Sequence, residues 1–121
     1  MKAIYIEEHG GPEVLTYGDL PEPSVGPNEV KIRVRACALN RLDVFTRAGA
    51  RGTRRRFTGP HVLGSDVAGD VVEVGGEVTR VNPGDRVVVN PRLNCRQCRL
   101  CVAGEEELCT RAGMLGSSIS G

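Results

Sequence analysis

Four of the five cysteines in this chain are spaced for metal binding. They follow the pattern Cys-x2-Cys-x2-Cys-x7-Cys and are Cys95, Cys98, Cys101 and Cys109. Gaps of two residues allow neighbouring thiolates to converge on one point, and a longer loop can bring the fourth thiolate back to it. Zinc takes four such ligands at about 2.3 Å in a tetrahedron, and four protein ligands leave no position for water. The spacing therefore predicts one structural Zn²⁺ ion per chain, in a lobe formed by residues 91–112.

Two other uses of these thiols stay open as alternatives. A [4Fe–4S] cluster is the stronger one, since ferredoxins also begin with Cys-x2-Cys-x2-Cys, but their run continues with three residues and then Cys-Pro. Here seven residues intervene and Thr110 follows Cys109. Disulfides are typical of exported proteins, whereas the N-terminal segment becomes acidic after six residues, unlike a signal peptide. We therefore expect a cytoplasmic protein whose thiols bind zinc.

The composition argues against several other classes of protein. Sixteen basic and fifteen acidic residues give a formal net charge of +1, which provides no general attraction to nucleic acid or to an anionic membrane. No run of eighteen apolar residues occurs, so we expect no membrane span. Aromatic residues make up only 3% of the chain, so its core must be built from smaller aliphatic side chains. The 16 glycines and 7 prolines favour many turns and a mainly β domain.

The hydrophobic pattern predicts short strands and one short helix. Residues 30–38 alternate between apolar and polar positions, which predicts a strand with one buried and one solvent-exposed face. The spacing becomes helical after Asn40, which is the expected N-cap, with Asp43 in the first turn and Gly49 as the stop signal. Further extended segments are expected at residues 2–7, 14–17, 67–74 and 86–90. These elements predict a small antiparallel barrel.

Several motifs in the right order resemble the N-terminal part of the medium-chain dehydrogenase/reductase superfamily, over essentially the whole chain. The cysteine lobe is similar to the structural-zinc lobe of alcohol dehydrogenases, and HGGPEVL at 9–15 resembles the quinone oxidoreductase branch. The other matching segments are ALNRLD at 38–43, LGSDVAG at 63–69 and VNPGDRV at 81–87. The resemblance implies a GroES-like, partly open β-barrel for residues 1–121, normally followed by a Rossmann domain that binds NAD(P)H. Because no Gly-x-Gly-x-x-Gly motif occurs, we expect the Rossmann domain to be absent from this chain and the chain to be truncated.

The departures from the family pattern concern the catalytic metal. Zinc alcohol dehydrogenases have a catalytic Cys where this sequence has Asn40, and a Gly-His-Glu where it has Gly64-Ser65-Asp66. Asn and Ser are poor zinc ligands compared with thiolate and imidazole. The family's hydroxyl proton relay corresponds to Leu42, which cannot pass a proton. The resemblance therefore implies a zinc-independent, quinone-oxidoreductase-like enzyme that keeps the structural-zinc lobe.

Such an enzyme would transfer hydride from NADPH to an electron-poor carbonyl, quinone or enone, and polar side chains could hold the acceptor's oxygen. The resemblance places four residues at the substrate: Asn40, Asp43, Ser65 and Asp66. Arg41 is the candidate for a cofactor phosphate. Each has a plainer interpretation, because Asn40 can be an ordinary N-cap, Asp43 can complement the helix dipole and Arg41 can be solvated.

The alternative function is a free-standing zinc-stabilised barrel that acts as a binding or assembly module. In either case the 121-residue chain alone is expected to be inactive. The sequence does not identify the hydride acceptor, the choice of NADH or NADPH as cofactor, or the oligomeric state. A homo-oligomer is one of the oligomeric states consistent with it. Neither His9 nor His61 has a partner at ligand spacing, and the arginine-rich segment 51–56 is expected to be a solvated loop.

Overall fold

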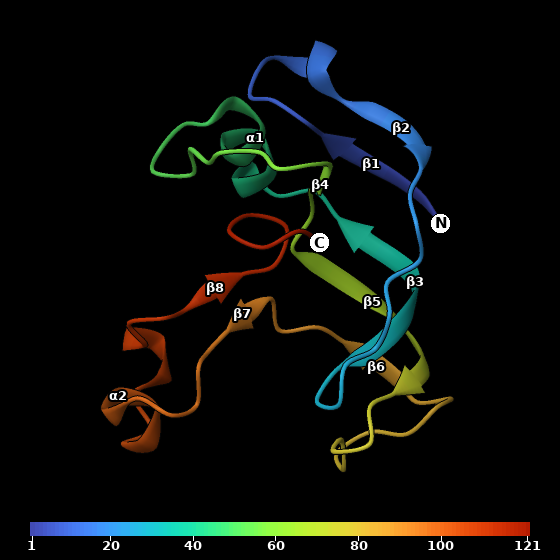
Figure 1. Cartoon of the computed structure of the whole chain (residues 1–121), viewed down its shortest axis with the longest axis vertical. Helices are drawn as coiled ribbons and strands as arrows, with labels where there is room; N and C mark the ends of the chain where they lie inside the picture. Colours follow the sequence, from blue (N-terminus) through green and yellow to red (C-terminus); the bar gives the residue numbers. More distant parts are fainter.

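The structure is a computed structural model that describes all 121 residues, and it is mainly β with few helices (Figure 1). Eight short strands, two α-helices and two 3-10 helices follow one another along the chain. In order they are β1 (Lys2–Ile6), η1 (Pro12–Val14), β2 (Thr16–Asp19), β3 (Val30–Ala38), α1 (Arg41–Ala48), β4 (His61–Val62), β5 (Asp66–Val74), β6 (Arg86–Val88), β7 (Arg92–Leu93), α2 (Arg99–Val102), η2 (Glu106–Leu108) and β8 (Gly113–Met114).

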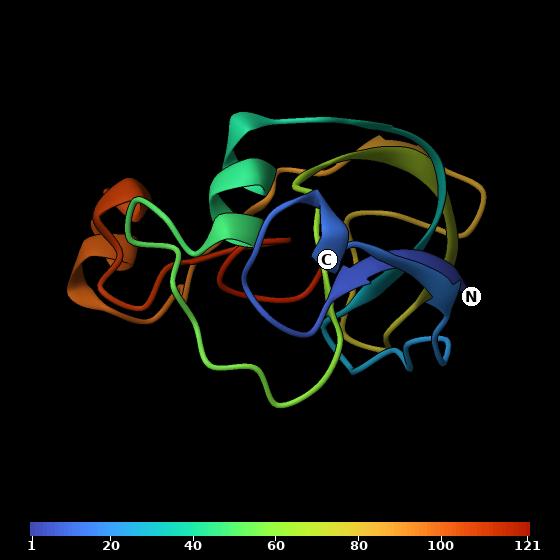
Figure 2. The ribbon, with the colours of Figure 1, turned by 90° about the horizontal axis from the view of Figure 1, so that it is seen from above.

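The strands form three antiparallel sheets that do not close into one barrel. Their orders are β2-β1-β4, β3-β5-β6 and β7-β8. The first two sheets and α1 make up the body, and the segment that carries α2 and η2 projects from one end of it in both views (Figures 1 and 2). The partly open, mainly β architecture expected from the sequence is thus confirmed.

The β3–β5 ladder is the longest pairing in the body, and it runs from Val30 opposite Val74 to Ala38 opposite Asp66. Gly69 lies in the middle of this ladder because the partner strand approaches closely. A Cβ at that position would lie 2.3 Å from the carbonyl oxygen of Arg33. Only glycine therefore fits this crossing without moving backbone atoms.

The core is small. Only 11 of the 121 residues are buried, and Ile6 and Val71 are its most buried aliphatic side chains. The alternation in β3 predicted a buried face along the whole strand, which is wrong: Val34 is 56% exposed, and every residue from Arg33 to Ala38 is exposed. The period marks which residues share a face, but it does not say whether another layer covers that face.

Helix α1 forms as predicted. The Asn40 side chain accepts a hydrogen bond from the N–H of Leu42, and the Asp43 carboxylate accepts one from the N–H of Asn40, which completes a capping box. Gly49 ends the helix in the left-handed region with φ of 67°. A Cβ there would lie 2.8 Å from the ring of His9, so the same glycine also lets the N-terminal loop pack against the helix end.

Two strand predictions need correction. The extended segment expected at 14–17 begins only at Thr16, because residues 12–14 form η1, with Pro12 near its start and the Glu13 carboxylate 2.7 Å from the N–H of Gly11. The strand expected at 86–90 ends at Val88. Asn90 turns the chain there, since its side-chain oxygen accepts a hydrogen bond from the N–H of Arg92.

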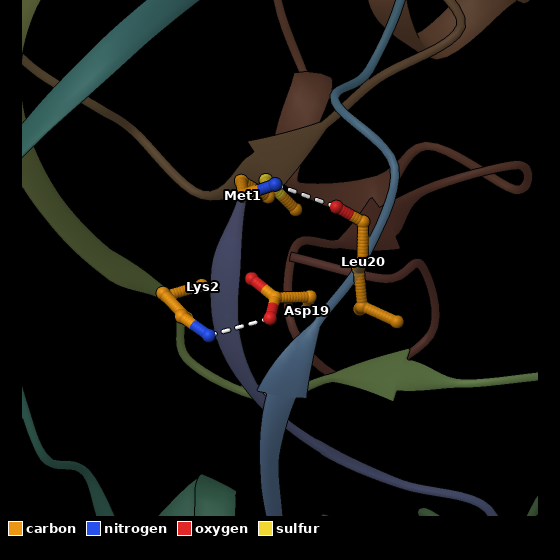
Figure 3. Close-up of polar contacts among 4 residues, drawn as sticks. All are labelled: Met1, Lys2, Asp19 and Leu20. Atoms are coloured by element: carbon orange, nitrogen blue, oxygen red, sulfur yellow. Dashed lines mark hydrogen bonds and ion pairs between the residues drawn. The ribbon is translucent and has the colours of Figure 1, made fainter.

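The start of the chain is tied to the end of β2 by polar contacts (Figure 3). The amino-terminal nitrogen of Met1 donates to the carbonyl oxygen of Leu20 at 2.6 Å, and Lys2 pairs with Asp19 at 2.5 Å. The Lys2 and Asp19 side chains are 59% and 72% exposed, so solvent screens most of their attraction. Neither α-helix is long and apolar enough to cross a lipid bilayer.

Candidate metal centre

Three elements of the projecting lobe place the cysteines close to one another. Cys95 follows β7, Cys98 is the N-cap of α2, Cys101 lies inside α2 and Cys109 is the C-cap of η2. The turn between the first two depends on Arg96, which adopts a left-handed φ of 57°. Backbone N–H groups donate to the sulfurs along this path, from Cys98 to Cys95 Sγ at 3.4 Å and from Cys101 to Cys98 Sγ at 3.5 Å.

The sulfur atoms have the spacing of a tetrahedral site. All four Sγ atoms lie within 4.8 Å of one another. The Cys109–Cys95, Cys95–Cys101 and Cys98–Cys109 sulfur pairs are 3.5, 3.9 and 4.0 Å apart. Four bonds of about 2.3 Å from a central zinc ion put the sulfurs about 3.8 Å apart, whereas a disulfide needs about 2.05 Å. The donor set and its geometry therefore fit a zinc ion.

The environment favours the thiolate at two of these positions and opposes it at a third. The backbone N–H of Gln97, followed by that of Cys98, lowers the pKa of Cys95 to about 6, and the N–H of Cys101 lowers the pKa of Cys98. Burial, with the neighbouring Cys98 and Cys109 sulfurs, raises the pKa of Cys101 to about 12. A dication at the centre favours the ionised form of every ligand, so it would remove this conflict.

The lobe has no apolar core of its own. In the segment 91–112 the only buried residues are Cys101 and Cys109. Val102 and Leu108, the apolar residues beside them, are 76% and 58% exposed. The lobe's fold therefore depends on what joins its cysteines, since little hydrophobic burial supports it.

A second group of polar residues, here called the Asn40 cluster, consists of Asn40, Asp43, Ser65 and Asp66. Asn40 Nδ2 donates to Asp66 Oδ2 at 3.3 Å, and the N–H of Asn40 donates to Asp43 Oδ2 at 2.8 Å. The structure thus brings three of the four together, at the junction of α1 and β5. Ser65 is 3% exposed and its hydroxyl donates to the carbonyl oxygen of Leu115 at 2.8 Å, so it faces the loop after β8 instead.

None of the Asn40 cluster belongs to the metal candidate. The cysteine group is the only set of three or more His, Cys, Asp or Glu side chains close enough together to hold a metal ion. A hollow of about 500 Å³ lies between the β3-β5-β6 sheet and the loop at 77–81, and none of the Asn40 cluster lines it. Arg41 is exposed on the first turn of α1, next to the cluster.

Sequence reasoning missed a buried polar network in the body. It joins residues from five separate segments: His9, Thr46, Arg55, His61 and Ser117. Their separations along the chain, such as 71 residues for Thr46 and Ser117, follow no ligand or capping pattern. The sequence showed only two histidines beside turns, with no partner at ligand spacing, so no local signal pointed to this network.

Comparison with known proteins gives one family model, described as the alcohol dehydrogenase GroES-like domain, which matches residues 26–121. A quinone oxidoreductase of Pseudomonas aeruginosa is 42% identical over 110 residues, which cover 88% of this chain and 32% of that protein. A crystal structure of an NAD-dependent alcohol dehydrogenase superposes with a TM-score of 0.91 at 47% identity, over 100% of this chain and 35% of that one.

A thermostable alcohol dehydrogenase from Pyrobaculum aerophilum, solved with cobalt and zinc bound, is similar as well. It superposes with a TM-score of 0.88 at 37% identity, over 100% of this chain and 36% of that one. The chain spans about a third of the length of the curated relatives it matches, between 32% and 36% for three of them.

Proposed function

Because this chain belongs to the family of alcohol dehydrogenase GroES-like domains, we propose that it is the N-terminal, substrate-side domain of a longer NAD(P)H-dependent oxidoreductase, here called the parent protein. The proposed domain covers residues 1–121 and includes the cysteine lobe at 91–112. The relatives it matches are named as dehydrogenases of alcohols, of L-threonine or of L-idonate, or as quinone oxidoreductases. This similarity supports the reaction class but does not choose among these substrates.

In this proposal Cys95, Cys98, Cys101 and Cys109 hold one structural zinc ion. Three sulfur–sulfur distances of 3.5–4.0 Å support it, as does the lack of any other buried residue in the lobe. So does the similar Pyrobaculum aerophilum enzyme that binds cobalt and zinc. With four protein ligands the ion would have no site for substrate, and it would supply a cross-link rather than Lewis-acid chemistry.

We place the parent protein among the quinone or activated-alkene reductases that work without a catalytic zinc. The observation that carries this choice is the Asn40 cluster. At the positions where the resembling zinc enzymes have their thiolate and imidazole, this chain has an amide that hydrogen-bonds to Asp66 and a hydroxyl that hydrogen-bonds to Leu115. Neither is a good zinc ligand.

The Asn40 side chain has the groups to hold an acceptor's oxygen. Its amide nitrogen carries two N–H donors, of which the contact with Asp66 uses one, and the carbonyl oxygen is fixed by the N–H of Leu42. The second N–H is free for a quinone or enone oxygen as negative charge develops on it. NAD(P)H, bound by the parent protein, would supply the hydride, and Asp66 would fix the orientation of the amide.

The test is turnover by the parent protein, with a quinone and NADPH or NADH in one assay and an alcohol with NAD⁺ or NADP⁺ in another. We expect quinone reduction that needs no second zinc ion. Asn40→Ser keeps a capping oxygen but removes the amide donors, so it should lower kcat/KM about 10²-fold, by analogy with the loss of one oxyanion donor. Asn28→Ser, an exposed amide distant in sequence, is the matched control. Alcohol oxidation that requires two zinc ions per chain would contradict the proposal.

A further inference from the structure

The buried polar network surrounds a histidine that the proposed reaction does not use. His61, on β4, is 2% exposed, and Thr46 and Ser117 in the same network are 0% and 9% exposed. His61 lies opposite Ile6 across the β1–β4 ladder, and the ring of Phe57 meets it edge-on with centroids 6.4 Å apart. Buried side chains of this polarity are expected to be fully hydrogen-bonded, which fixes how each one must be protonated.

The partners of His61 require its neutral form. Arg55 Nη1 lies 2.7 Å from His61 Nδ1 and 3.0 Å from Nε2, and the carbonyl oxygen of Gly116 lies 3.2 Å from Nε2. A guanidinium can only donate and a carbonyl can only accept. The form of His61 that suits both partners therefore carries its proton on Nε2, directed at Gly116, and its lone pair on Nδ1, the ring nitrogen nearer to Arg55. A second ring proton would face the guanidinium.

The same contacts hold the loop at residues 115–118. Arg55 Nη1 also donates to the carbonyl oxygen of Ser117 at 2.8 Å, so Arg55 and His61 bind two consecutive carbonyls. From the other side, Thr46 of α1 donates from Oγ1 to Ser117 Oγ at 3.1 Å. The loop is thereby joined to β4 and to α1 through groups that water scarcely reaches.

Arg55 is itself held in place by the second histidine. His9 Nε2 accepts from the backbone N–H of Arg55 at 3.0 Å, while Nδ1 lies 3.0 Å from the carbonyl oxygen of Thr46. The charged or titratable groups that face His61 are thus Arg55 and His9. Glu7 and Glu8, which follow β1, are exposed and make no hydrogen bond to it. No carboxylate is placed to compensate a charge on His61.

We propose that Arg55 and His61 form an acid-sensitive latch, which holds the loop at 115–118 against β4 and α1 while His61 is neutral and releases it when His61 is protonated. Protonation removes the acceptor that Arg55 uses and brings two cations into contact in a buried site. The released carbonyls of Gly116 and Ser117 can then be hydrated. This device is independent of the reaction proposed above.

The direction of the pH effect follows from the surroundings of His61. Burial, followed by the charge of Arg55, lowers the pKa of His61 below its ordinary value of 6.5. In the open loop His61 regains the ordinary value, so the open state takes up more protons. The latch is fully effective above pH 6.5, and it weakens as the pH falls from there towards the lowered pKa.

Hydrogen–deuterium exchange in the zinc-loaded parent protein tests the latch, because it reports on one peptide at a time. After correction for the intrinsic rate, the protection of residues 115–118 should fall by up to about tenfold per pH unit below 6.5. His61→Gln is neutral at every pH and can still accept from Arg55 and donate to Gly116, so it should remove this pH dependence. Arg54→Met, at an exposed arginine of the same loop, should keep it.

Two further measurements separate the latch from general acid effects. Acid also competes for zinc thiolates, so the zinc content and the protection of residues 95–109 are followed at each pH. Arg55→Met removes the facing cation and should move the transition to higher pH even if His61→Gln folds poorly. A loop whose protection does not change with pH in the wild type, or changes equally in His61→Gln, overturns the proposal.

Discussion

The cysteine lobe and the Asn40 cluster are both groups of polar side chains on one small domain. They differ in what can hold these side chains together. In the lobe, four sulfurs lie within 4.8 Å of one another, and one of the thiols has its pKa raised to about 12 by burial. In the Asn40 cluster, amide, carboxylate and backbone groups hydrogen-bond to one another, although Asp43 Oδ1 is buried without a partner. The Asn40 cluster is thus held together by its own hydrogen bonds, whereas the cysteine site is arranged for a cation to join its ligands.

This difference shows what each region contributes. The lobe has no hydrophobic core, so a cation there acts on the fold. The Asn40 cluster is supported by α1 and by the β3–β5 ladder, so its side chains are placed without a metal. In our proposal these side chains act on the substrate. On this account the two regions are independent of each other. A substitution that disrupts both regions would contradict it, and a substitution that affects only one region would support it.

The largest expected effect is the loss of a metal ligand in the lobe. Cys101→Ser replaces a buried thiolate by a poor zinc ligand, so the lobe should lose its zinc and residues 91–112 should lose their protection from hydrogen exchange. The β3–β5 ladder should keep its protection. Cys37→Ser, at an exposed cysteine outside the cluster, is the control and should leave the zinc content unchanged. If Cys101→Ser kept its zinc and the protection of residues 91–112, the fold of the lobe would not depend on this ligand.

The next effect lies in the body. Gly69→Ala puts a Cβ 2.3 Å from the carbonyl oxygen of Arg33, and the strain should lower the free energy of unfolding by about 2–3 kcal/mol in urea denaturation. Gly59→Ala, where a Cβ has nothing within 4 Å, should change it by less than about 0.5 kcal/mol. The zinc content of both folded variants should equal that of the wild type. Loss of zinc from folded Gly69→Ala would show that the two regions are not independent.

A smaller effect is expected at the cap of α1. Asn40→Ala removes the acceptor for the N–H of Leu42 and the donor to Asp66, which should cost about 1 kcal/mol of stability. Asn40→Ser should recover most of that loss, because serine also caps helices. Thermal unfolding at constant zinc occupancy measures both. Equal destabilisation by the two variants would mean that the contact with Asp66, rather than the cap, stabilises this junction.

The smallest effect is expected for the exposed ion pair of Lys2 and Asp19. Both side chains are more than half exposed, so Lys2→Ala should change the free energy of unfolding by no more than about 1 kcal/mol. The difference should shrink further at high salt. A larger loss, insensitive to salt, would mean that the aliphatic part of Lys2 or the edge of β1 matters more than its charge.

Sequence patterns predicted the local features well. The N-cap of α1, its glycine stop and the cysteine spacing depend on residues only a few positions apart, and all appear as expected in the structure. Patterns predicted burial poorly, as β3 shows, because the layer that covers a strand lies elsewhere in the chain. They missed the contacts of His61 with Arg55 and Gly116 altogether, since nothing local distinguishes this histidine from a surface one.

The count of zinc ions per chain tests the central claim most directly, because it samples both regions at once. Protein purified without chelators should contain one zinc per chain, which Cys101→Ser loses and Asn40→Ser keeps. Two zinc ions per chain, with the second lost in Asn40→Ser, would contradict the account of the Asn40 cluster. Iron, or four cysteines with neither metal, would contradict the account of the lobe.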